Sequence, residues 1–95
     1  MFYVYVLRSQ KNGHLYKGQT SDISNRLEMH NSGLVRYTKR YLPWVLVYHE
    51  IYTTRAEAMQ REAYLKTGAG RDWLQRKLKE FDDAADHQAA SDVNS

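Results

Sequence analysis

The stretch HLYKGQT, residues 14–20, predicts the return strand of a β-hairpin. The outgoing strand is FYVYVL, residues 2–7, whose aromatic and β-branched residues favour extended structure. Asn12 and Gly13 stand between the two, and an Asn-Gly pair suits a two-residue turn because both residues tolerate positive φ. The chain is therefore expected to begin with two antiparallel strands.

A plain hairpin does not need a Tyr-Lys-Gly sequence in its return strand. A two-residue loop pairs Ser9 with Tyr16, Leu7 with Gly18 and Tyr5 with Thr20. In this register Tyr5 and Tyr16 lie on one face, offset along the hairpin, and Gly18 leaves open backbone between them. A three-residue loop with a bulge would shift the register and could separate the tyrosines. Aromatic residues are common in strands, so the pair alone also fits a purely structural role.

The rest of the sequence predicts a third strand and three helices. The segments are a helix within residues 20–33, a loop at 34–43, a strand at 44–52, a helix within 53–70 and a last helix at 71–81. The third strand is apolar enough to be central in the sheet. The order β-β-α-β-α-α predicts an α+β domain with a small three-stranded antiparallel sheet flanked by helices.

Local signals mark the helix ends. Thr20 or Ser21 is expected to cap the first helix. Thr54 and Glu57 have the spacing of a capping box for the second helix, and Gly68 is expected to stop it.

The composition predicts one domain, residues 1–81, followed by a disordered acidic tail, residues 82–95, which has little apolar content. The chain of 95 residues has no cysteine, and no stretch approaches the roughly 20 apolar residues of a membrane span. These features favour a cytoplasmic protein, and we expect a monomer. Residues 1–81 hold all 14 basic side chains and 7 of the 11 acidic ones, a net charge of +7. That excess favours polyanionic partners, although it also fits simple solubility.

The first helix carries two candidate functional side chains. Arg26 and His30 are four residues apart and lie next to the apolar stripe of Ile23 and Leu27, at the expected margin of the sheet face. Arginine suits a phosphate fork, and histidine titrates near neutrality. The alternative is a surface arginine and a histidine that is satisfied by a neighbour.

The second helix places a carboxylate on its apolar side. Glu62 falls within the arc of Ala58, Met59 and Leu65. A carboxylate on a buried face is costly unless it is paired or bound to a metal ion. A metal ligand and an i, i+4 ion pair with Lys66 both fit this position.

The loop sequence RYTKRY, residues 36–41, interleaves cations with tyrosines. Such loops can grip backbone phosphates and stack on bases, although many basic loops are only solvated. The candidate nucleic-acid-binding residues are Lys17, Arg36, Lys39, Arg40 and Lys66.

Taken in order, these residues resemble the GIY-YIG nuclease superfamily over about residues 2–81. YVYVL stands at the family's first motif and YKGQT at its second. RLEMHNSG, YTKRYLPWVLVYHE and EAMQREAYLKTGAGRDWL are similar to the small stand-alone bacterial members, in which one GIY-YIG domain makes up nearly the whole protein. Lys17 departs from the apolar residue that is usual in the second motif, and by alternation it points away from the Tyr16 face.

The resemblance implies a metal-dependent endonuclease that hydrolyses phosphodiester bonds in nucleic acid; DNA is favoured as the substrate, and RNA stays open. By resemblance, Glu62 holds one divalent cation, Mg²⁺ or Mn²⁺, and Tyr16 acts as the general base toward the attacking water. Arg26 would stabilise charge that develops on the phosphate. Tyr5 and His30 would hydrogen-bond around Tyr16 and the water.

Two other functions fit the same residues. A nucleic-acid-binding module without catalysis would also explain the charge and the basic loop. The larger family nucleases often carry an Asn downstream of the metal-binding glutamate, and no clear counterpart follows Glu62 in this sequence. An interaction domain would instead use Trp44, Trp73 and the tyrosines as a contact surface.

Overall fold

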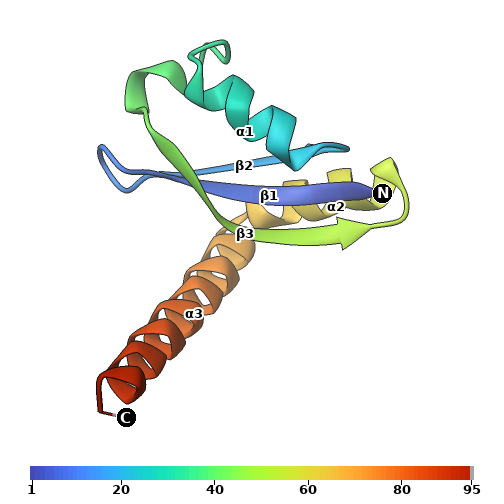
Figure 1. The fold of residues 1–95 in the computed structure, drawn as a ribbon. Helices are drawn as coiled ribbons and strands as arrows, with labels where there is room; N and C mark the ends of the chain where they lie inside the picture. Colours follow the sequence, from blue (N-terminus) through green and yellow to red (C-terminus); the bar gives the residue numbers. More distant parts are fainter. Residues whose placement is uncertain (95) are drawn as a thin grey trace.

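The computed structural model describes residues 1–94, with side chains described as far as residue 82. The elements are β1 (Phe2–Ser9), β2 (Leu15–Thr20), α1 (Ile23–Asn31), the 3-10 helix η1 (Lys39–Tyr41), β3 (Trp44–Tyr52), α2 (Arg55–Leu65) and α3 (Gly68–Asn94). The antiparallel sheet has the order β2-β1-β3, with α1 over one face and α2 over the other (Figure 1). The predicted α+β class and element order are confirmed.

The hairpin has a four-residue loop rather than the predicted two-residue turn. The Ser9 N–H donates to the His14 carbonyl over 2.8 Å, and Gly13, the last of the four residues between them, has a φ of 78°. The observed register pairs Tyr5 with Gly18 and Leu7 with Tyr16. This register is shifted by two residues from the prediction. Because side chains alternate with a period of two, Tyr5 and Tyr16 still share one face.

β1 is the central strand, and the prediction that the third strand is central is wrong. Both faces of β1 are covered, so that Val4 and Tyr5 are 0 % and 2 % exposed. β3 pairs with β1 alone, and its Ile51 is 54 % exposed. The apolar start of β3 is covered by the loop before it, because the Trp44 indole is buried and donates to the Thr38 carbonyl. An apolar sequence therefore does not require a central place in this sheet.

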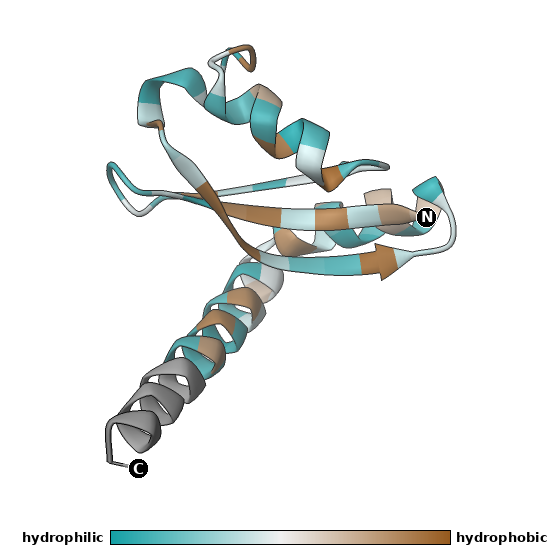
Figure 2. Cartoon of the chain, viewed as in Figure 1, coloured by the Kyte–Doolittle hydropathy of each residue, from teal (hydrophilic) through white to brown (hydrophobic). Residues whose placement is uncertain are grey.

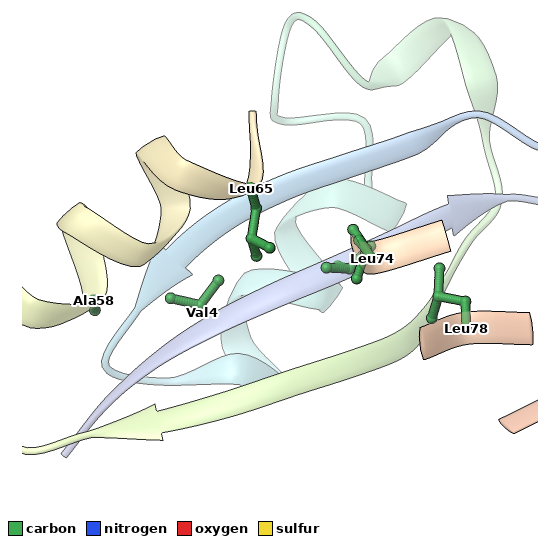
Figure 3. Packing of buried hydrophobic residues seen from close by; sticks show 6 residues of the cluster. Val4, Ala58, Leu65, Leu74 and Leu78 are labelled. Carbon is green, nitrogen blue, oxygen red and sulfur yellow. The ribbon is translucent and has the colours of Figure 1, made fainter. Parts of the chain in front are cut away.

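Two apolar clusters lie on opposite faces of the sheet. The cluster beneath α2 and α3 comprises Val4, Val6, Ala58, Leu65, Leu74 and Leu78 (Figure 3). The cluster beneath α1 comprises Tyr5, Leu7 and Trp44, with Tyr16, Ile23 and Leu27 packed against it. Figure 2 shows hydrophobic residues along β1 and in recurring bands along α3. Alternation along β1 thus sends its even-numbered residues to one core and its odd-numbered residues to the other.

Asp22 caps α1, in place of the predicted Thr20 or the serine after it. The Asp22 carboxylate accepts from the Asn25 N–H over 3.1 Å. Thr20 ends β2, and its hydroxyl bonds the Asp22 backbone instead. The predicted capping box of Thr54 and Glu57 is confirmed at the start of α2.

α3 is longer at both ends than the predicted helix. Gly68 opens α3 rather than closing α2, which ends at Leu65. The helix also continues through residues 82–94, where the sequence predicted a disordered tail, and residue 95 lies outside the described residues. This segment is rich in alanine and has no glycine or proline, a composition that favours helix. Within the described chain, no helix combines the length and the apolar character that crossing a membrane requires.

A half-buried carboxylate fastens β3 to α2. Glu50 accepts hydrogen bonds from the hydroxyls of Tyr48 and Tyr52 over 2.6 and 2.7 Å. Arg61 of α2 donates to the same carboxylate over 2.9 and 3.2 Å. Burial acts to raise the pKa of Glu50, but the bonds from Arg61 and the two tyrosines outweigh burial and hold this pKa below its ordinary value. The ion pair of Glu50 and Arg61 therefore positions α2, which carries the candidate metal ligand.

Candidate active site

Tyr5 stands at the centre of the candidate site. It projects from β1 on the α1 face and is 2 % exposed. The Arg26 Nε–H donates to the Tyr5 hydroxyl over 3.3 Å, and His30 Nε2 lies 3.1 Å from the same oxygen. The two side chains that the sequence placed at the edge of the α1 stripe therefore meet on one strand residue.

The contacts form a hydrogen-bonded chain with one consistent direction. The Thr38 hydroxyl donates to the Val35 carbonyl over 3.3 Å, and its oxygen accepts from His30 Nδ1 over 2.8 Å. With its proton on Nδ1, His30 accepts a hydrogen bond from the Tyr5 hydroxyl at Nε2. The Tyr5 oxygen in turn accepts a hydrogen bond from Arg26. Each polar group is satisfied, and the Tyr5 hydroxyl is held in one orientation.

The surroundings set the charge of each group. Burial, and then the Arg26 charge, lower the pKa of His30 to about 4, so the imidazole is neutral at neutral pH. Burial raises the pKa of Tyr5 in spite of the opposing bond from Arg26, so Tyr5 keeps its proton. The bond with Tyr5 raises the pKa of Arg26 further above its ordinary value. One permanent cation therefore lies beside a neutral tyrosine and a neutral histidine.

Gly18 has no side chain and therefore leaves space for the Tyr5 ring. A Cβ atom on Gly18 would lie 2.5 Å from the Tyr5 hydroxyl oxygen and 2.6 Å from Cζ. The Tyr5 ring lies over the backbone of this glycine, which is its partner across the hairpin. A larger residue at this position would push the ring away from Arg26 and His30.

Tyr16 lies beside this chain and also lines the surface. Its ring centroid is 4.8 Å from that of His30 and 6.3 Å from that of Tyr5. Tyr16 is half-buried and borders a surface hollow. After the larger effect of Tyr5, Tyr16 also contributes to the raised pKa of Arg26, through its charge and a hydrogen bond. Tyr16 is thus the tyrosine of the pair that a ligand can reach.

Glu62 lies within electrostatic reach of Tyr5, whose pKa its charge raises. The Lys66 ammonium donates to Glu62 Oε1 over 3.0 Å, and the Glu62 side chain is 22 % exposed. The ion pair that the sequence left open therefore forms, and the carboxylate stays accessible.

The donors fit a hard divalent ion that is held by few protein ligands. Nowhere in the described part of the chain do three or more His, Cys, Asp or Glu side chains gather as a metal cage would require. A single accessible carboxylate suits Mg²⁺ or Mn²⁺, because these ions keep several waters and take further oxygens from phosphate. The role of Glu62 as that ligand stays a prediction.

The predicted nucleic-acid-binding residues fall into two groups. The loop residues Arg36, Lys39 and Arg40 line a hollow of about 480 Å³. Lys17 and Lys66 line another, of about 520 Å³, at the free edge of β2. An exposed tyrosine of the basic loop borders both hollows, so the two groups are neighbours on one surface.

Thr38 is the site residue that sequence reasoning missed. It is fully buried, bonds His30 through its hydroxyl and accepts from the Trp44 indole through its carbonyl over 2.9 Å. In the sequence Thr38 lies within the basic loop, among residues that are expected to face solvent. The available signal is that Thr38 is the one small polar residue in a run of cations and tyrosines.

The sequence profile of the GIY-YIG catalytic domain matches residues 1–77 of the chain. The chain belongs to the GIY-YIG family. The matched residues include Tyr5, Tyr16 and Gly18 of the hairpin, as well as α1 and all of α2. The second motif of this GIY-YIG domain therefore coincides with the point where the Tyr5 ring covers a glycine.

This GIY-YIG protein is homologous to small bacterial UPF0213 proteins. It is 41% identical to the UPF0213 protein of Staphylococcus haemolyticus over 78 residues, which are 81% of this chain and 89% of the relative. It is 46% identical to that of Bacillus licheniformis over 79 residues, which are 82% of this chain and 74% of the relative. The solution NMR structure of a UPF0213 protein from Bacillus halodurans is 31% identical, with a TM-score of 0.49, and covers 80% of this chain and 84% of that one.

Proposed function

We propose that this protein is a metal-dependent endonuclease that hydrolyses phosphodiester bonds in nucleic acid, with DNA as the expected substrate. The observation that carries the proposal is the grouping of three side chains: the Tyr5 ring covers Gly18, its hydroxyl accepts from Arg26, and the Tyr16 ring lies 6.3 Å away. The charge of the Glu62 carboxylate also acts on Tyr5. Membership of the GIY-YIG family supports the same reaction.

Each residue has a role that its contacts suit. Tyr16, beside the Arg26 charge and next to the surface, would take a proton from the attacking water. Arg26 would hold a phosphate oxygen and stabilise the charge that develops there. Tyr5 and His30 would fix the orientation of Arg26, because the hydrogen-bonded chain leaves the Tyr5 oxygen only as an acceptor toward it.

Glu62 would hold the divalent cation, which when bound supplies positive charge to the phosphate. Lys66 already neutralises this carboxylate. Ion binding at Glu62 must therefore compete with an exposed ion pair, whose typical strength is only about 0.3–0.5 kcal/mol for an i, i+4 helix pair. The Lys66 contact is thus compatible with a metal-binding role.

The decisive experiment is cleavage of branched, nicked and linear DNA and RNA with Mg²⁺ or Mn²⁺, using wild type, Tyr16→Phe and Tyr64→Phe. Tyr16→Phe keeps the ring and removes the oxygen, so cleavage should slow by roughly 10²- to 10⁴-fold. Tyr64→Phe makes the same change at a tyrosine of α2 that lines none of the three hollows and contacts Arg61 through its ring, so it should cleave like wild type. Equal rates for Tyr16→Phe and wild type would make Tyr16 a packing residue.

A nucleic-acid-binding module without catalysis is the other outcome of this experiment. It is the conclusion if wild type binds these substrates but cleaves none of them with either ion. Binding that falls steeply with salt would then separate it from a protein-interaction domain, because phosphate contacts release counterions.

A further inference from the structure

Three cations from three separate elements gather at the free edge of β2. Lys17 comes from β2, Lys66 follows the last residue of α2, and Arg71 lies in the first turn of α3. All three line the hollow of about 520 Å³ that Tyr16 and Tyr37 also border. Arg71 has no part in the hydrogen-bonded chain around Tyr5, and no sequence pattern singles it out.

The charged side chains that line this hollow are all cations. Burial lowers the pKa of Lys17, and the nearby charges of Arg71 and Lys66 lower it further. Among the described residues that line this hollow, none is acidic. Lys66 pairs with Glu62 beside the hollow, but neither Lys17 nor Arg71 forms an ion pair among the described residues. The cluster therefore keeps an excess of positive charge, which favours an anion between these side chains.

The hollow adjoins the candidate active site. Tyr16 forms part of its wall, and the ring of Tyr37, which is 72 % exposed, lies 6.0 Å from the Tyr16 ring. A second hollow shares Lys17, Tyr37 and Arg71 and continues along α3 past Lys79 to Asp82, whose carboxylate pairs with Arg8 over 3.9 Å. A basic path therefore runs from the catalytic tyrosine, around the edge of β2, to α3.

We propose that Lys17, Lys66 and Arg71 form a second phosphate site, which binds the nucleic-acid backbone phosphate next to the one that is cleaved. The inference rests on the proposed function, because it takes the phosphate beside Tyr16 and Arg26 as the reacting one. Lys17, which lies on β2 between Tyr16 and Gly18, would thus serve the substrate rather than the core.

Binding of a fluorescein-labelled DNA duplex, measured by fluorescence anisotropy in EDTA, tests this site without cleavage. Lys17→Gln and Arg71→Gln should each weaken binding, on the order of ten-fold at about 0.1 M NaCl. Each should also reduce the slope of log K against log[NaCl] by about 1. Arg76→Gln is the matched control, because Arg76 is an exposed cation on α3 that lines neither hollow. It should bind with the wild-type slope.

Stability separates a binding role from a structural one. Because the folded protein lowers the pKa of Lys17, its charged form destabilises the fold at neutral pH, and Lys17→Gln should raise the melting temperature while it weakens binding. Lys66 is left unchanged in this test because it also bonds Glu62. A fall in both stability and affinity would instead assign Lys17 to the core and overturn its part in the site.

Single neutral methylphosphonate linkages, placed in turn along the duplex, locate the contact. One linkage should weaken wild-type binding and cause no further loss in Arg71→Gln, since both changes remove one interaction. If Arg71→Gln and Lys17→Gln bind like Arg76→Gln, or if wild type does not bind the duplex, the second phosphate site is refuted. If their effects appear but wild type cleaves no substrate, Lys17 and Arg71 still bind a backbone phosphate, but the nuclease proposal fails and with it the placement of this phosphate next to a cleaved one.

Discussion

Acidification from pH 7 to pH 5 should destabilise the protein through one residue, His30. The ring is fully buried and hydrogen-bonded at both nitrogens, and its pKa falls from the ordinary 6.5 to about 4, first through burial and then through the Arg26 charge. The unfolded chain therefore binds a proton on this histidine that the folded chain refuses. Stability is fully present above pH 6.5 and is lost as the pH falls toward 4, below which the loss is complete.

The size of this effect follows from the two pKa values. At pH 5 the unfolded histidine is almost fully protonated and the folded one is mostly neutral, which corresponds to about 2 kcal/mol of lost stability. With a urea m-value of about 1 to 2 kcal/mol per molar, the unfolding midpoint should fall by about 1 to 2 M. Glu50 does not interfere, because a carboxyl whose pKa is lowered affects stability mainly below about pH 4.5.

Urea unfolding of wild type and His30→Gln at pH 7 and pH 5 measures the effect. His30→Gln should be less stable at pH 7, because the amide reproduces the hydrogen bonds to Tyr5 and Thr38 poorly, but it should lose much less stability on acidification. NMR titration of the wild-type ring should show no protonation above about pH 5, in line with the lowered pKa. Equal losses in both proteins, or a ring that titrates near 6.5, would refute the neutral buried histidine.

Three further changes test other parts of the structure. Gly18→Ala should lower stability by about 1 to 3 kcal/mol and slow cleavage, because the added Cβ would lie 2.5 Å from a tyrosine hydroxyl. Gly68→Ala is the control in thermal melts: its Cβ would meet nothing within 4 Å, so stability should stay the same or rise slightly. Glu50→Gln should lower stability by on the order of 2 kcal/mol in urea titrations, since it weakens four hydrogen bonds to one carboxylate. Deletion of all residues after Phe81 should leave the melting temperature nearly unchanged and strengthen DNA binding, because it removes negative charge; a large fall in melting temperature would show that this segment packs on the domain.

The face of the hairpin could be predicted although its register could not. The sequence places Tyr5 and Tyr16 an odd number of residues apart, and both the predicted two-residue loop and the observed four-residue loop are even. Any even change in loop length preserves which residues share a face, because side chains alternate along each strand. The predicted partner of Tyr5 was wrong because the loop is two residues longer than predicted. The structure shows that this partner is Gly18.

Long-range partners set the limit of the sequence argument. Arg26 and His30 could be placed on one side of α1 from helical periodicity, and Glu62 could be placed on the apolar side of α2. Their partners across the fold, above all Thr38, could not be predicted, because no local pattern links a loop residue to a helix eight residues before it. The central place of β1 was missed for a similar reason, since strand order depends on which helices cover which strand.

Lys17 shows how one residue can look like a departure in the sequence and have a clear physical setting in the structure. Its side chain alternates away from Tyr16, so it joins the β2 edge where α2 ends and α3 begins. An apolar residue there would remove the repulsion from Lys66 and Arg71 and make the fold more stable. A cation there instead places positive charge between Tyr16 and the start of α3. A residue whose charge lowers the stability of the fold but raises its affinity for a polyanion is expected to serve substrate binding.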